Sequence, residues 1–170
     1  MYEKIAKTFI ACSIVFGTTV VLSIANEDIS QSEAQAETTQ PYYDYQGYTA
    51  QGGDFVLDQA FYNGLKAGNV TFNDIKVNSK YDSGSESKVI YDQKFEKVNG
   101  NKANSVEFEI AEDAVSLQDM RVQFGQNFEY QPPIHGDKVN SSDGLYGYEV
   151  GEGYIVFHVS DGYVTSVTVS

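Results

Sequence analysis

The stretch YIVFHVSDGYVTSVTV, residues 154–169, decides the fold. Two runs of alternating apolar residues lie on either side of Asp161-Gly162, the dipeptide that suits the two-residue type I′ turn of a β-hairpin. Because side chains alternate between the two faces of a strand, a regular register sets Phe157 opposite Ser166 on one face. The end of the chain therefore predicts two antiparallel strands.

Further strand patterns lie upstream of this hairpin. Residues 145–150 predict a third strand beside it. Residues 88–98 and 106–110 are separated by the turn signal at 99–101 and predict a second hairpin. Residues 70–77 alternate with a change of phase in their middle, which predicts a bulge or a tight turn there. The strands together predict an antiparallel sheet of hairpins.

Two segments have helix-start and helix-stop residues at the right distances. Asp54 is placed to cap a helix that ends at Gly68, and Ser116 is placed to cap one that ends at Gly125. We therefore predict an α+β fold with the two short helices packed on one face of the sheet. The predicted parts are a signal peptide (residues 1–36), a tyrosine-rich N-terminal segment (37–53) and a single α+β domain (54–170).

The first 36 residues have the pattern of a secretory signal peptide. Two lysines precede an uncharged run at 8–25, and Ala34-Gln35-Ala36 is a small-x-small cleavage site. A membrane anchor is the alternative, weakened by the polar residues inside the run, and 23–25 offers a second cleavage site. We expect a secreted, extracellular or cell-surface-associated protein without stable membrane insertion after cleavage.

Composition excludes several classes of protein. The chain has 170 residues, 41% of them apolar and 21% charged, which is the range of globular proteins. Its single cysteine rules out a disulfide framework, a four-thiolate zinc site and an iron–sulfur cluster. That cysteine, Cys12, leaves with the signal peptide, so the mature chain also lacks a thiol nucleophile.

Recognisable catalytic motifs are absent from the sequence. There is no G-x-S-x-G, no H-E-x-x-H and no P-loop, and His158 falls inside a predicted strand while His135 falls in a predicted loop. We expect no catalytic residues, no metal ligands and no cofactor, and hence not an enzyme. Carboxylates are numerous, so a cell-wall hydrolase with two facing carboxylates stays as a minor alternative.

Charge is unevenly distributed. The formal charge is −13, of which −11 belongs to the mature chain, yet residues 76–102 carry a net +2. A positive segment with an aromatic residue could contact phosphates and stack bases, although an ordinary mixed-charge solvent face is the simpler interpretation. The candidate nucleic-acid-binding residues are Lys76, Lys80, Lys88, Lys94, Lys97, Lys102 and Tyr91.

A second aromatic group lies near the N-terminus. Tyr42, Tyr43, Tyr45 and Tyr48 fall within seven residues. They could form an exposed stacking surface for bases or sugars. The alternative is an edge strand with its core contacts.

Several strings of this sequence resemble the immunodominant staphylococcal antigen B family. They are PYYDYQGY at 41–48, FVLD at 55–58, NVTFNDIK at 69–76 and SLQD at 116–119, and the ending at 164–169 fits as well. These motifs are specific to the family and carry no catalytic content.

This resemblance implies a secreted or cell-surface-associated bacterial antigen, virulence-associated and non-enzymatic, with extracellular nucleic-acid binding. The expected partners are extracellular DNA or RNA. A protein-binding surface module, with host or cell-wall proteins as partners and no affinity for nucleic acid, is the alternative. This chain departs from the family in its charge, which is acidic where the family's is basic.

Overall fold

The computed structural model describes residues 40–133 and 140–170. The predicted signal peptide and His135 lie outside these ranges. None of the helices within the described ranges has the length and apolar character needed to cross a bilayer.

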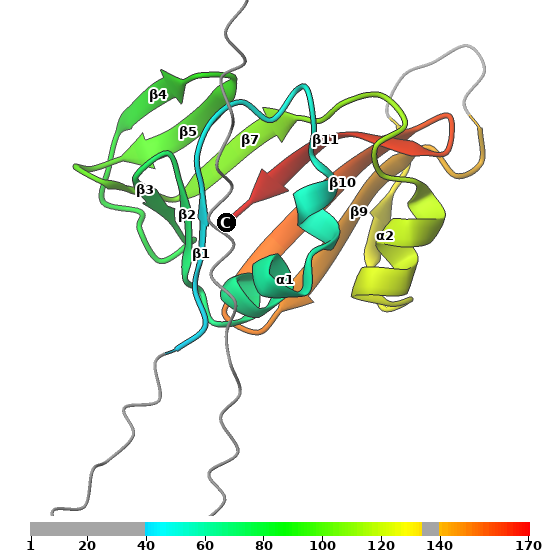
Figure 1. The fold of residues 1–170 in the computed structure, drawn as a ribbon, viewed down its shortest axis with the longest axis horizontal. Helices are drawn as coiled ribbons and strands as arrows, with labels where there is room; N and C mark the ends of the chain where they lie inside the picture. Colours follow the sequence, from blue (N-terminus) through cyan, green and yellow to red (C-terminus); the bar gives the residue numbers. More distant parts are fainter. Residues whose placement is uncertain (1–39, 134–139) are drawn as a thin grey trace, which may run out of the picture. The chain divides into compact units, whose positions relative to one another are not determined.

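The strands form two sheets, and most neighbouring strands are antiparallel (Figure 1). Two neighbouring pairs of the smaller sheet, β1–β2 and β3–β6, are parallel. The smaller sheet has the order β1 (Tyr43–Tyr45), β2 (Val70–Phe72), β3 (Ile75–Val77), β6 (Lys102–Ala103). The larger has the order β4 (Glu86–Ile90), β5 (Gln93–Val98), β7 (Ser105–Glu109), β11 (Tyr163–Val169), β10 (Gly153–Ser160), β9 (Gly144–Val150), β8 (Glu129–Gln131).

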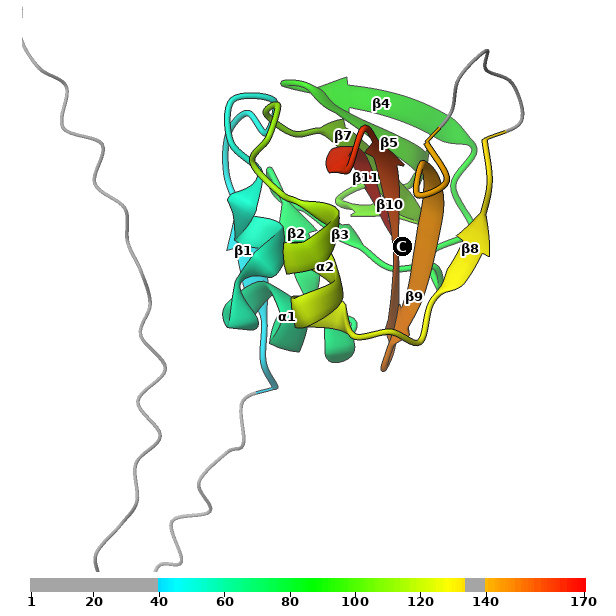
Figure 2. The same cartoon turned by 90° about the vertical axis from the view of Figure 1, so that its right-hand side faces the viewer.

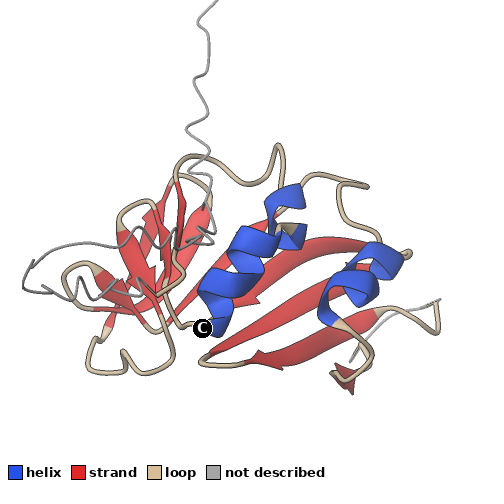
Figure 3. Ribbon diagram, turned by 60° about the horizontal axis from the view of Figure 1, so that its bottom comes forward, coloured by secondary structure: helices blue, strands red, loops and turns tan. Residues whose placement is uncertain are grey.

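The helices are short and lie on the same side of the seven-stranded sheet (Figure 2). They are the 3₁₀ helix η1 (Asp54–Leu57), α1 (Gln59–Lys66) and α2 (Leu117–Phe124). Among the described residues, no helix covers the opposite face, here called the outer face (Figure 3). The predicted α+β class, with two helices and mostly antiparallel sheets, is confirmed.

The two helix boundaries differ in how well the sequence predicts them. Ser116 caps α2 as predicted, because its Oγ accepts a hydrogen bond from the backbone N of Asp119 at 3.0 Å. The other helix was predicted to begin at Asp54, which is wrong: Asp54 begins η1, and α1 starts only at Gln59.

The predicted register of the last two strands holds next to the turn, where Val159 pairs with Val164, but it is wrong from His158 back to Ile155. The ladder shifts between His158 and Val159, so Phe157 lies opposite Val167 instead of Ser166. The cause is burial: Val164 and Val167 are both fully buried, and strict alternation would point them to opposite faces. A bulge on β11 brings both valines to the core.

The predicted single strand at 88–98 is in fact two strands. β4 and β5 are joined by a tight turn at Tyr91-Asp92, and Tyr91 has a φ of 55°. Phe95 is fully buried, but Val89 and Tyr91 are exposed, so the shared face predicted for these three residues does not exist. The turn instead places an aromatic side chain at the tip of the β4–β5 hairpin.

Candidate functional site

The six predicted lysines come from β3, β4, β5, β6 and the loop after β3, which lie at one end of the domain (Figure 1). They are divided between the sheets. Lys76 and Lys102 are register partners in the parallel β3–β6 pair, and Lys102 lies 5.0 Å from the centre of the Tyr81 ring. Lys88, Lys94 and Lys97 lie in the β4–β5 hairpin of the larger sheet.

Two of these lysines contact carboxylates. Lys94 Nζ lies 2.8 Å from Glu96 Oε1, and this hydrogen bond raises the pKa of Lys94 and lowers that of Glu96. Lys80 forms an ion pair with Glu152, whose pKa it lowers. Both pairs are exposed, so they contribute little to stability, but they reduce the positive charge available to a polyanion.

Two of the predicted tyrosines meet at the tip of the β4–β5 hairpin. The rings of Tyr48 and Tyr91 are 4.7 Å apart with an interplanar angle of 68°. They remain 62% and 54% exposed, and Val89 beside them is 66% exposed. We call Tyr48, Tyr91 and the three hairpin lysines, Lys88, Lys94 and Lys97, the tyrosine–lysine edge.

Asp92 holds the loop that carries Tyr48. Its carboxylate accepts hydrogen bonds from the backbone N of Thr49 at 2.9 and 3.0 Å and from that of Ala50 at 2.7 Å. The phenol of Tyr45 donates to the carbonyl oxygen of Tyr48 at 2.6 Å. The backbone is therefore held at Tyr48 itself and at the two residues that follow it, which fixes the position of the Tyr48 side chain.

Two buried amide side chains, those of Asn73 and Gln93, hold the same loop at Gly47. Asn73 Nδ2 donates to Gln93 Oε1 at 2.7 Å, and Gln93 Nε2 donates to the carbonyl oxygen of Gly47 at 2.8 Å. The backbone N of Gly47 donates to Asn73 Oδ1 at 2.7 Å, which closes the network. Sequence reasoning missed Asn73, Asp92 and Gln93, because their partners lie 20 to 46 residues away.

The other N-terminal tyrosines behave differently from Tyr48. Tyr45 lies 4.3 Å from the Phe55 ring and Tyr43 lies 5.3 Å from that of Phe61, so both belong to β1 and its core contacts. Burial is the main reason why the pKa of Tyr43 is raised. Tyr42 is exposed but stands apart from this packing.

A hollow of about 500 Å³ lies at the turn end of the β10–β11 pair. Glu109, Glu112, Asp113 and Asp161 line it together with His158, which is exposed on the outer face. In the described part of the chain, no group of three His, Cys, Asp or Glu side chains could hold a metal ion. Burial and the nearby Asp54 raise the pKa of Asp58, but Asp58 does not line this hollow.

Comparison with known proteins identifies the same family as the sequence strings quoted above. The family model described as immunodominant staphylococcal antigen B matches residues 42–169, nearly all of the described domain. The chain belongs to this family. Relatives named immunodominant staphylococcal antigen B from Staphylococcus aureus strains USA300, NCTC 8325 / PS 47 and COL are each 31% identical over 150 residues. The match covers 86% of this chain and 82% of each relative.

The predicted resemblance is thus confirmed, and the family supports an antigen-type protein. No solved structure matches the chain. The family name describes an antigen and no enzymatic activity.

Proposed function

We propose that this protein is a secreted, non-enzymatic binding protein outside the cell, and that its tyrosine–lysine edge contacts single-stranded extracellular nucleic acid. The observation that carries the proposal is the exposed Tyr48–Tyr91 pair at the tip of an edge hairpin whose strands also carry Lys88, Lys94 and Lys97. Aromatic rings stack on unpaired bases of any sequence, and lysines neutralise phosphates.

The position of the β4–β5 hairpin at the edge of the sheet allows an extended nucleic acid strand to reach it. β4 is one of the two edge strands of the larger sheet, and four of its five residues are exposed. An unpaired nucleic acid strand can follow this edge with its bases toward the rings. A duplex keeps its bases stacked inside and gains only the phosphate contacts.

The acidic remainder of the protein makes this binding weak and sensitive to salt. Lys94 is the register partner of Glu107 and contacts Glu96, so acidic groups lie within the ~8 Å screening length at physiological salt. We expect measurable affinity at low salt that falls steeply as salt is raised.

Titration with a labelled single-stranded oligonucleotide tests the proposal. Replacing Lys88, Lys94 and Lys97 by Gln should lower the slope of log affinity against log salt by about 2, the value for three lost phosphate contacts. Replacing Lys76, Lys80 and Lys102 by Gln removes the same charge from the smaller sheet and the loop after β3. Equal losses from both triple variants, or binding that does not respond to salt, contradict the assignment to this edge.

Protein binding without nucleic-acid affinity is the second candidate. The uncovered outer face favours it, because Glu107 and Glu109 on β7 and Glu149 on β9 are exposed and alternate with buried residues. A pull-down with wall or host proteins that is lost in Glu107→Gln/Glu109→Gln, while oligonucleotides do not bind, would support this candidate. Deleting residues 37–48 is unsuitable as a test, because it removes β1 from the smaller sheet.

A further inference from the structure

Arg121, the only arginine of the sequence, lies on α2, away from the β4–β5 end (Figure 1). Its guanidinium carbon is 5.2 Å from the centre of the Phe128 ring and 5.4 Å from that of Tyr146. Such cation–π contacts position a guanidinium without neutralising its charge. The aromatic pair therefore holds Arg121 in place and leaves most of its hydrogen-bonding capacity unused.

Most donors of this guanidinium have no acceptor among the described residues. A guanidinium has five N–H donors, but the one bond found is a long contact of 3.5 Å from Nη2 to the hydroxyl of Tyr146. Nε is buried without any partner, and no described carboxylate lies within 4.0 Å. Because Nε is enclosed, an acceptor supplied from outside can meet only the terminal Nη groups. These carry four N–H bonds, and the contact with Tyr146 uses one of them.

The neighbouring acidic residues are engaged elsewhere. Asp119 accepts a hydrogen bond from Ser116 Oγ at 2.6 Å. Asp143 accepts from the backbone N of Asp161 at 2.9 Å and is 8% exposed. Glu129 is the acceptor of the Tyr154 hydroxyl at 3.3 Å. In a strongly acidic protein, the sole arginine is thus left facing a space that none of these three carboxylates fills.

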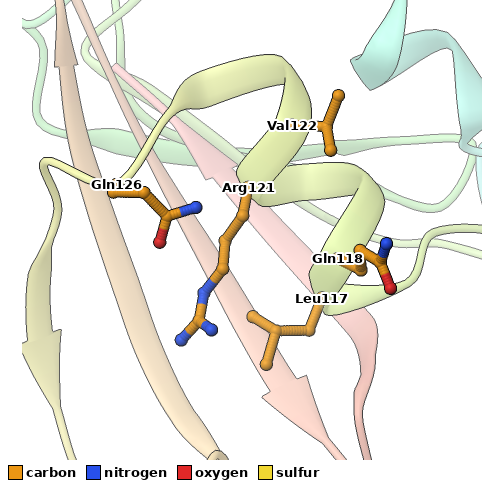
Figure 4. A pocket seen from close by; sticks show the side chains of 5 residues that line it. All are labelled: Leu117, Gln118, Arg121, Val122 and Gln126. Carbon is orange, nitrogen blue, oxygen red and sulfur yellow. The ribbon is translucent and has the colours of Figure 1, made fainter.

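That space is a hollow of about 430 Å³, lined by Leu117, Gln118, Arg121, Val122 and Gln126. Arg121, Leu117 and Gln126 project on the same side of α2 (Figure 4). Glutamine amides can both donate to and accept from a peptide group, and Leu117 offers apolar contact. The lining thus combines one cation with groups suited to a short peptide.

We propose that this hollow binds a peptide through its carboxylate, supplied either by a C-terminus or by an acidic side chain. A planar guanidinium matches a carboxylate with two parallel N–H···O bonds. One arginine balances the single charge of a carboxylate, whereas a phosphate in this acidic domain would need further cations. The site is separate from the tyrosine–lysine edge and does not depend on nucleic-acid binding.

The test uses the unique Nε–Hε signal of Arg121 in a ¹H–¹⁵N spectrum, which needs no assignment because the chain has one arginine. The probes are an N-acetylated leucine-rich tetrapeptide with a free C-terminus, the same peptide as its amide, and the amide with an internal glutamate. We expect the first or the third to shift the signal saturably and the plain amide to leave it unchanged. Which of the two binds identifies the source of the carboxylate.

Variants separate binding from folding. Arg121→Gln should weaken binding about tenfold to hundredfold, the loss for a hydrogen-bonded charge. Gln126→Glu places a like charge in the hollow on an exposed residue and should weaken binding without disturbing the aromatic contacts. Lys66→Gln, which removes one positive charge from α1, is the control and should bind as the wild type does.

The proposal is overturned if the plain amide shifts the signal as strongly as the carboxylate peptides do. It is also overturned if no peptide shifts it, or if Gln126→Glu binds as tightly as the wild type. A signal that responds to inorganic phosphate or an oligonucleotide but not to the peptides would assign the hollow to phosphate groups and likewise contradict the proposal.

Discussion

The two ends of the seven-stranded sheet use tyrosine in opposite ways. At the β9–β10 end, Tyr146 and Tyr148 are buried under α2 with Phe124 and Phe128 around them. Burial raises the pKa of Tyr148 to about 12. At the β4–β5 end, Tyr48 and Tyr91 contact each other but remain exposed. The difference shows that aromatic content by itself does not identify a binding surface; what matters is which rings the core leaves uncovered.

The two ends also differ in what holds them together. Apolar packing stabilises the β9–β10 end, whereas Asp92, Asn73 and Gln93 hold the β4–β5 end through hydrogen bonds to the backbone of the 47–50 loop. Apolar burial scales with area removed from water, while each hydrogen bond adds little net stability. We therefore expect the β9–β10 end to be the more stable of the two.

The largest effect is expected from Phe157→Ala. Phe157 is fully buried and its ring lies 4.9 Å from that of Phe124, so the substitution leaves a cavity beneath α2. The free energy of unfolding should fall by about 3–5 kcal/mol. Urea unfolding followed by circular dichroism measures it. A loss below about 1 kcal/mol would mean that this end is not held by apolar packing.

A smaller effect is expected from Asp92→Ala. The change leaves the backbone N–H groups of Thr49 and Ala50 without their acceptor and should cost about 1–3 kcal/mol. Hydrogen exchange at these two amides should accelerate, while exchange in β10 stays slow. Asp82→Ala, at an exposed loop residue, is the control. Unchanged exchange at both amides would refute the role of Asp92.

The smallest effect concerns pH and Asp58. Its pKa is higher in the folded protein than the usual value, mainly through burial and then through Asp54, so the folded state holds the proton more tightly than the unfolded state does. Stability contributed by this group is therefore present at low pH and falls as pH rises through the raised pKa. Asp58→Asn should remove this fall and slightly stabilise the protein at pH 7, measured by thermal unfolding at several pH values. A variant less stable than wild type at pH 7 would contradict this sign.

Local signals in the sequence predict local structure well. Ser116 and Gly125 mark the ends of α2, and Asn73 and Asp74 both take positive φ in the tight turn between β2 and β3. The bulge on β11 could not be predicted from alternation, because it depends on the need to bury Val164 and Val167 together.

The candidate site was only partly predictable for the same reason. Tyr48 and Tyr91 could each be singled out, but their contact across 43 residues depends on the Asp92 bonds to the loop. The sequence of the lysine segment gave no sign that Lys94 contacts Glu96, or that Lys80 contacts Glu152, which lies far away in the chain. The Arg121 hollow has no sequence signal beyond the arginine itself, since its lining comes from α2 and the residue that follows Gly125.

Binding of a labelled oligo-dT strand at low salt by the wild type and by Tyr48→Ala/Tyr91→Ala tests the central claim most directly. Both side chains are exposed, so the double variant should unfold at nearly the wild-type temperature. We predict that it binds at least about fivefold more weakly, the loss for one stacked base. Tyr163→Ala, a partly exposed tyrosine on β11, should bind as the wild type does. Equal affinity of the wild type and the double variant, or no binding by the wild type, would contradict the account.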